Sequence, residues 1–240
     1  MIITNYSTIK CNYMNILKKI VFSTLLLVGN YICSAQEISI RGGFNLSQFQ
    51  FKIGDIVSHR EGTKLNPGFN VGPIIDIPLQ NIFSVETGIL FTSKGNKISG
   101  NPLQGVNDYL FQINTFYLDF PVLLKATIPI KKTKIFAMAG GYAGRALYGN
   151  IIARGEENSV IKHFKNKIQW GSKPNEYDRF DYGLKFGAGI KVRKYQIGAF
   201  YEIGLKDFSN DMMYELRNRV LEFYIAYRVK DLKRTKNKNH

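Results

Sequence analysis

The chain has 240 residues and a formal net charge of +15, and it is rich in Tyr, Phe and Gly but poor in Pro. This length allows one domain, or two very small ones, and the composition favours strands and tight turns over a helical bundle. A basic chain can bind nucleic acid, but here the basic residues are not interleaved with aromatic residues, so we expect no nucleic-acid partner.

The N-terminus has the three parts of a secretory signal. Lys18 and Lys19 form a basic region, residues 20–28 form a short apolar region, and Cys33-Ser34-Ala35 supplies small residues for cleavage before Gln36. The sequence therefore predicts a signal peptide over residues 1–35, with Met14 as a candidate true start.

The two cysteines allow one alternative. Lipidation of Cys33 would make the protein a lipoprotein, but Tyr31-Ile32 is a poor approach to such a site. Cys11 and Cys33 both precede the predicted cut. We therefore expect the mature protein to have no disulfide, no thiolate chemistry and no Cys-ligated metal.

After Glu37 the chain alternates between apolar and polar residues in eight segments. These segments are residues 38–46, 69–77, 83–92, 116–125, 135–148, 180–190, 195–205 and 221–229. Period-two alternation is the signature of β-strands. The more apolar parity carries no charge in any segment; in the weakest, the fifth, we assign Phe136, Met138 and Tyr142 to it. A charged side chain facing lipid at the bilayer midplane costs about 2–4 kcal/mol, so this exclusion indicates a lipid-facing surface.

The connections between segments alternate in length. The long ones are Gln50–Leu65, Ser93–Phe111, Gly149–Arg179 and Asp207–Asn218, and the short ones are Gln80-Asn81, Pro129–Thr133 and Arg193-Lys194. Outer-membrane barrels combine short periplasmic turns with long extracellular loops. We predict an all-β fold: a transmembrane antiparallel up-and-down β-barrel of about eight strands over residues 36–230, followed by a basic periplasmic tail at 231–240.

A water-soluble barrel with an apolar interior is the alternative reading of the same alternation. Its outer face should be rich in Lys, Glu and Thr. The polar parity is instead crowded with glycines, at positions 43, 72, 88, 183, 187, 189, 198 and 204. Small residues fit the narrow lumen of an eight-stranded barrel, so the pattern favours the membrane barrel.

Six segments together resemble the PorT-like outer-membrane β-barrel family, which is common in the Bacteroidetes. They are Ile40–Ser47, Phe83–Gly95, Tyr117–Lys125, Ala139–Tyr142, Asp181–Gly189 and Tyr201–Leu205, and their order and spacing carry the resemblance. It implies an outer-membrane barrel, and a few family members are linked to protein secretion. The chain departs from the usual aromatic ending, because Tyr227-Arg-Val229 continues into the basic tail.

Charged residues on the polar parity form the candidate site. They are Arg41, Asp76, Glu86, Asp119, Lys125, Asp181, Lys185, Glu202, Glu222 and Arg228, with Arg145 as a further candidate. An eight-stranded barrel has little free bore, so we expect these groups to pair and fill the lumen. A gate or a narrow ion path is the alternative.

Catalysis and metal binding have little support in the sequence. The histidines, His59, His163 and His240, lie in two long loops and the tail, and Lys162, Lys165 and Lys167 flank His163 without a carboxylate. We expect no catalytic residue, no cofactor and no metal. The chain is interpreted as a non-enzymatic outer-membrane protein with a filled lumen, acting structurally or through its extracellular loops.

Two alternatives remain open: a component of an outer-membrane transport or protein-secretion system, and a rim-sited hydrolase. Outer-membrane lipid is an expected partner, and the basic periplasmic rim is suited to anionic head groups or to an acidic periplasmic or secretion-system protein. The loop Gly149–Arg179, with the only tryptophan, Trp170, is the best candidate for an external binding surface.

Overall fold

The computed structural model describes residues 36–53, 56–58, 63–100, 107–157, 160–174, 176–210 and 214–232. The predicted signal peptide, with Met14 and both cysteines, lies outside the described residues. His59 and the tail residues 233–240 also lie outside them.

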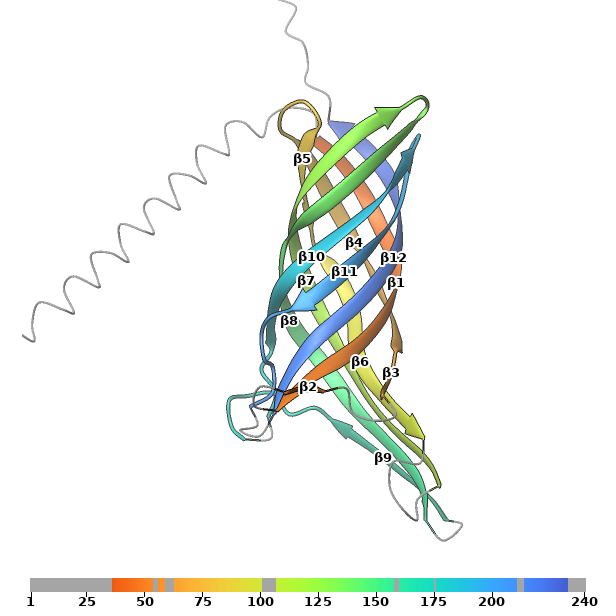
Figure 1. Ribbon diagram of the computed structural model, residues 1–240, viewed down its shortest axis with the longest axis vertical. Coiled ribbons are helices and arrows are strands. Elements are labelled where there is room, and N and C mark those ends of the chain that lie inside the picture. Colours follow the sequence, from red (N-terminus) through yellow and green to blue (C-terminus); the bar gives the residue numbers. More distant parts are fainter. Residues whose placement is uncertain are drawn as a thin grey trace, which may run out of the picture.

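The described chain forms one antiparallel sheet that closes on itself as a barrel (Figure 1). The strands are β1 (Gln36–Ile53), β2 (Ile56–Ser58), β3 (Thr63–Lys64), β4 (Asn66–Pro78), β5 (Phe83–Gly88), β6 (Leu90–Gly100), β7 (Asn107–Ile130), β8 (Thr133–Glu157), β9 (Val160–Lys167), β10 (Phe180–Val192), β11 (Tyr195–Gly204) and β12 (Glu215–Leu232). Successive long strands pair around the wall, and β1 closes the ring by pairing with β12 on one side and β4 on the other.

The ring has eight strands, which confirms the predicted architecture. β5 and β6 count as one strand of the wall, because both pair with β4 and β7 and only Ile89 separates them. The short strands β2, β3 and β9 extend the wall at one end. We call this the long-loop end, and the opposite end, with the connections at 79–82, 131–132 and 193–194, the short-turn end.

Each of the three short turns contains a residue in the left-handed backbone region, and in the connection at 79–82 this residue is Asn81, with φ 53°. Lys131 has φ 53° and Arg193 has φ 54°, and each is the first residue of a two-residue turn between long strands. Such turns match the twist of the paired strands but require a positive φ, which is unfavourable for a residue with a side chain. The hairpin geometry therefore overrides the local preference of these two residues.

The strands are longer than the sequence predicts, so two predicted loops are mostly strand. β6 continues to Gly100 and β7 begins at Asn107, inside the predicted loop Ser93–Phe111. β8 continues to Glu157 and pairs with β9, inside the predicted loop Gly149–Arg179. The reason is that hairpin hydrogen bonds continue beyond the apolar band, where both faces are polar and the alternation disappears.

Seven of the eight segments face as predicted, with the apolar parity outward. The fifth, within β8, was assigned wrongly: Phe136, Met138 and Tyr142 are buried inside the barrel, and the alternate positions Ala137 and Ala139 are exposed. The size of the side chains determines which face of β8 points into the lumen. The large side chains fill the lumen opposite inward-facing glycines, and the alanines complete the outer wall.

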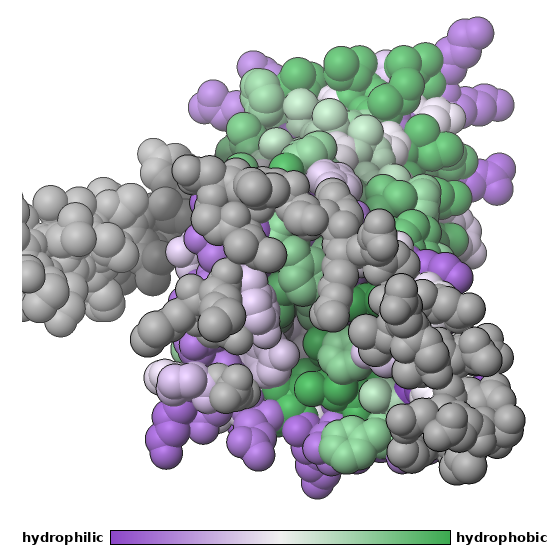
Figure 2. Space-filling view, turned by 60° about the horizontal axis from the view of Figure 1, so that its bottom comes forward, coloured by the Kyte–Doolittle hydropathy of each residue, from purple (hydrophilic) through white to green (hydrophobic). Residues whose placement is uncertain are grey.

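The outer wall is apolar over most of its height. Figure 2 shows hydrophobic side chains over the wall, with hydrophilic side chains at its margins. Toward the long-loop end the apolar surface finishes in a row of four rings from β4, β6, β7 and β8. The centroid distances are 5.8 Å for Phe69–Phe91, 5.9 Å for Phe91–Phe116 and 4.4 Å for Phe116–Tyr148. Aromatic rows of this kind mark the membrane interface of outer-membrane barrels. Among the described residues, no helix is long and apolar enough to cross a membrane.

Candidate functional site

The inward face of the barrel carries the charged residues that the sequence singles out. Eight of the ten predicted residues are buried, each with at most 3% of its surface exposed: Arg41, Glu86, Asp119, Lys125, Asp181, Lys185, Glu202 and Glu222. Asp76 and Arg228 lie nearer the short-turn end, and their side chains are 16% and 24% exposed. The alternation of the strands explains this placement, since every second residue of a barrel strand faces the lumen.

One group of charges lies toward the short-turn end of the lumen. Arg41 forms an ion pair with Glu86, and its guanidinium lies 4.0 Å from the ring centroid of Tyr224. Lys125 Nζ donates to Asp76 Oδ2 at 2.6 Å and to Glu86 Oε2 at 3.3 Å, and it also reaches Gln196 Oε1 at 2.7 Å. Two cations and two carboxylates therefore form one connected network.

A second group fills the middle of the lumen around Lys94 and Lys185. Lys94 Nζ lies 2.9 Å from Asp119 Oδ2, 3.4 Å from Asp181 Oδ2 and 3.2 Å from Glu202 Oε2. Lys185 Nζ lies 2.6 Å from Glu202 Oε1 and 2.5 Å from Glu222 Oε2. Glu202 thus joins the two ammonium groups.

Lys94 is the member of this group that the sequence pattern does not single out. The sequence predicts it in the loop Ser93–Phe111, whereas it lies on β6 with no exposed side-chain surface. The available signal was parity: counting on by twos from the inward residues Glu86 and Thr92 reaches Lys94.

Arg145 does not belong to the lumen. It is exposed on the outer face of β8, and its guanidinium lies 5.9 Å from the ring centroid of Phe180. The wrong parity for β8 explains this error, because Arg145 shares the face of Ala143 rather than that of Tyr142. The outer wall of β8 therefore carries an arginine beside an aromatic ring.

Apolar side chains fill the lumen on both sides of the central charges. One cluster, near the Arg41 group, contains Ile74, Leu90, Leu123, Phe136, Met138, Phe200, Tyr224 and Ala226. The other, toward the long-loop end, contains Phe49, Ile113, Ile168, Phe208 and Leu216, with Trp170 packed against it. Ions and water would have to pass both clusters, so the lumen has the character of a protein core.

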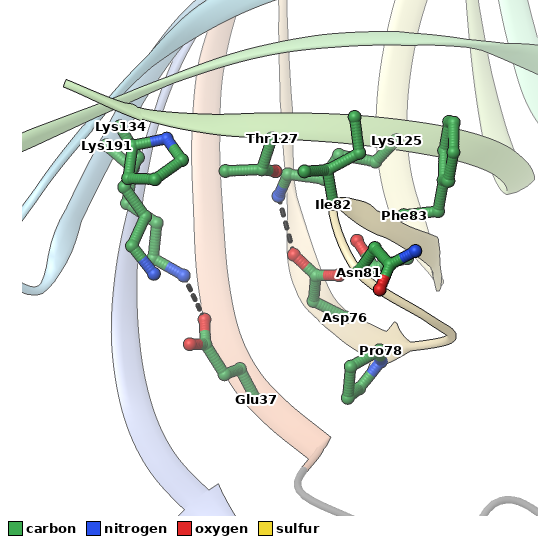
Figure 3. A pocket seen from close by; sticks show the side chains of 12 residues that line it. Glu37, Asp76, Pro78, Asn81, Ile82, Phe83, Lys125, Thr127, Lys134 and Lys191 are labelled. Atoms are coloured by element: carbon green, nitrogen blue, oxygen red, sulfur yellow. Dashed lines mark hydrogen bonds and ion pairs between the residues drawn. The ribbon is translucent and has the colours of Figure 1, made fainter.

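A cavity of about 350 Å³ lies at the short-turn end (Figure 3). Lys125 and Asp76 form its floor toward the charge network, and Glu37 and Lys191 form an ion pair at its side. Lys134 also lines the cavity. It is an open vestibule lined by both charged and apolar side chains, and the ion pair of Lys125 and Glu86 separates it from the rest of the lumen.

The described residues do not assemble a recognisable catalytic or metal site. No group of three or more His, Cys, Asp or Glu residues among them is placed to hold a metal ion. His163 is exposed on β9, where its cross-strand partner is Arg154. His59 lies outside the described residues. An imidazole opposite a guanidinium lacks the carboxylate that would orient it as a base.

These features define the class of protein: a small outer-membrane β-barrel whose lumen is filled by side chains. Residues 34–210 match the family model described as outer membrane protein beta-barrel domain, and the chain belongs to this family. A comparison with curated proteins gave no match.

Several solved barrels are similar over most of their length. Ail, the attachment invasion locus protein of Yersinia pestis, is 15% identical, with 82% of this chain and 99% of Ail covered and a TM-score of 0.32. OprG, an outer membrane protein of Pseudomonas aeruginosa, is 12% identical, with 82% and 97% covered and a TM-score of 0.39. Neisserial surface protein A is 8% identical, with 80% and 97% covered and a TM-score of 0.37.

Proposed function

We propose that this protein is a non-enzymatic, non-conducting outer-membrane barrel that acts through the surface at its long-loop end. The filled lumen is the observation that carries the proposal. Eight predicted charged residues and Lys94 are buried in a lumen that two apolar clusters also fill, so a pore would require many paired charges and packed rings to move together. Such a network stabilises one arrangement of the barrel wall. Because the lumen is filled, the surface at the long-loop end is the part of the protein that is available to contact molecules outside the cell.

The orientation is part of the same proposal. The short-turn end faces the periplasm and the long-loop end faces outward, as in other outer-membrane barrels. Residues 1–35 act as an export signal that is cleaved before Gln36, and the basic residues after Leu232 stay in the periplasm.

Planar-bilayer recording tests the filled lumen. The protein is folded in detergent, its folding is verified by heat-modifiable gel migration, and it is then inserted at known amounts. We expect no steady conductance above background. Sustained, reproducible current steps from the folded preparation would contradict the proposal, and the gel assay ensures that silence does not reflect a misfolded sample.

A transport or protein-secretion role with partners is the second candidate, and the short-turn end favours it. Lys134 and Lys191 line the open cavity there, and Lys131, Lys132, Arg193 and Lys194 lie in the adjacent turns. This basic rim suits an acidic periplasmic protein, in keeping with the resemblance to PorT-like proteins. Crosslinking in intact cells, followed by purification, tests it: neutralising the four turn residues should remove a specific crosslinked partner.

A further inference from the structure

The lipid-facing side of the wall changes character where β6, β7 and β8 pass beyond the aromatic row. The wall continues as a sheet of five strands, β3, β6, β7, β8 and β9, visible at the lower right of Figure 1. Residues that are direct cross-strand partners lie on the same face of such a sheet. The residue pairing between these five strands therefore shows which side chains lie on the outer face of the sheet, the face that continues from the lipid-facing wall.

One row crosses all five strands on that face. Lys64 pairs with Lys97, Lys97 with Gln112, Gln112 with Ile152, and Ile152 with Lys165. The row on one side ends in Lys167, opposite Asn150, and the row on the other side contains Arg154, opposite His163. We call Lys64, Lys97, Arg154, Lys165 and Lys167 the cationic face.

The cationic face has no internal charge compensation. Among the described side chains, none of its five members forms an ion pair, and no carboxylate lies in the three rows. Lys64 and Lys97 are directly opposite one another, an arrangement of like charges that destabilises a sheet. An anion between the rows would remove this conflict.

Protection of a sheet edge explains only part of the pattern. Lysines on an edge strand prevent pairing with other chains, and Lys165 and Lys167 lie on β9, which pairs only with β8. Lys97 and Arg154 lie on the internal strands β6 and β8, where edge protection gives no reason for a charge.

The depth of the cationic face points to its ligand. The row of Lys97 and Gln112 lies four residues along the strands from the row of Ser93, Phe116 and Tyr148. At about 3.3 Å per residue, this places the lysines roughly 13 Å along the tilted strands from the aromatic rings. Aromatic rings lie at the edge of the hydrocarbon region, so the cationic face lies at the level of the lipid head groups.

We propose that the cationic face binds the phosphorylated head group of an outer-leaflet glycolipid. The face is continuous with the lipid-contacting wall, and its charges are at head-group depth. Between the charges, Gln112 donates to Asn114 Oδ1 at 3.1 Å and Asn114 donates to Asn150 Oδ1 at 3.3 Å, so the Nδ2 of Asn150 ends this chain and can donate to a phosphate or sugar oxygen. Basic residues at a membrane surface attract anionic lipids in this way. The proposal rests on the orientation proposed above, with the long-loop end outside.

Native mass spectrometry of the full chain, released from membranes in mild detergent, tests the proposal. The probes are lipid A carrying both phosphates and the same lipid without phosphate. We expect wild type to retain the phosphorylated form selectively. We expect the double variant Lys97→Gln, Lys165→Gln to bind it roughly 30-fold more weakly, the loss expected for two cations at an anionic surface. Equal binding of the two lipids, or equal binding by wild type and variant, would overturn the proposal.

Two controls make the result specific. Lys131→Gln with Lys132→Gln removes the same charge at the short-turn end and should weaken binding of the phosphorylated lipid much less than the double variant Lys97→Gln, Lys165→Gln does. Lys97→Glu should weaken lipid binding but slow proteolysis of the sheet formed by β3, β6, β7, β8 and β9, because it creates an attractive pair with Lys64. If Lys97 had only a structural role, lipid binding and resistance to proteolysis would rise or fall together.

Two more measurements separate other outcomes. Binding of a soluble sulfated oligosaccharide without binding of phosphorylated lipid would overturn the proposal in favour of a soluble polyanion. Protease added to intact cells should cut the long-loop end. If it does not, the orientation is wrong, and this failure is distinct from a failure of lipid binding or from the appearance of a conductance.

Discussion

Replacing Lys94 with methionine tests whether the central charges stabilise the barrel as a network. The substitution keeps a long side chain of similar size but removes the ammonium group that lies within 3.4 Å of Asp119, Asp181 and Glu202. Loss of the ammonium group affects the three carboxylates to different degrees, because they keep different numbers of other partners. Those remaining partners determine the expected loss in the free energy of unfolding.

Two of the three carboxylates keep other partners. Glu202 keeps Lys185 at 2.6 Å, and Asp181 Oδ2 still accepts hydrogen bonds from Asn218 Nδ2 at 2.9 Å and Tyr142 Oη at 3.1 Å. Asp119 retains no ion pair with a described residue, and its second oxygen, Oδ1, has no hydrogen-bond partner among the described residues. Removing one partner of a buried pair costs about 3–5 kcal/mol, so we expect Lys94→Met to lower the free energy of unfolding by about that amount.

Urea unfolding in lipid vesicles, followed by the fluorescence of Trp170 and by heat-modifiable gel migration, measures this loss. Lys97→Met, three residues further on β6 and on the outer face, is the matched control and should change stability by less than about 1 kcal/mol. Adding Asp119→Asn to Lys94→Met should recover part of the loss, because the carboxylate left without a counter-charge is then gone. A loss under about 1 kcal/mol for Lys94→Met, or a further loss in the double variant, would falsify the network reasoning.

Three further predictions use the same unfolding assay. Gly183→Ala should destabilise the barrel by about 1–3 kcal/mol, because the added Cβ would lie 2.1 Å from the carbonyl oxygen of Ile203. Gly42→Ala should be nearly neutral, because a Cβ added there has no atom within 4 Å. Equal effects of the two substitutions would contradict the packing argument. Lys131→Gly should raise stability by up to about 1 kcal/mol, because glycine adopts a φ of 53° without strain. Lys132→Gly, in the same turn but without a positive φ, should not raise stability. A gain in stability for Lys132→Gly alone would refute the assigned turn geometry. Arg41→Met should lower the free energy of unfolding by about 3–5 kcal/mol, because Arg41 and Glu86 are fully buried. Arg228→Met should lower it by less than about 1 kcal/mol, because the pair of Arg228 with Glu37 is about a quarter exposed. Similar losses for the two variants would show that burial does not determine the strength of these pairs.

The sequence determines the architecture of this protein more directly than its details. Alternation over short segments predicts eight strands, and the length of the connections predicts which turns share an end. The alternation also places Arg41, Glu86 and Lys185 inside, because a residue at the polar parity of a barrel strand has no other position.

The sequence predicts the wrong orientation for β8 and the wrong position for Lys94, in both cases because apolar and polar residues do not alternate there. In β8 both parities are apolar, and only the size of Phe136 and Met138 relative to the alanines decides which side faces the lumen. Beyond the aromatic row lipid no longer selects apolar residues, so a strand such as the second half of β6 resembles a loop. Lys94 was missed for this reason, although it contacts more carboxylates than any of the predicted cations.

The pairing of β1 with β12 also has a consequence for assembly. This seam joins Gln36 to Leu232 and Phe44 to Phe223, residues separated by most of the chain. Until the last strand, β12, arrives, β1 has an unpaired edge that is long, apolar on one side and able to add strands from other chains. Contacts between such distant segments form slowly, so the interval before closure is the vulnerable period. Biogenesis of this protein must therefore keep its first strand occupied or shielded until its last strand is delivered.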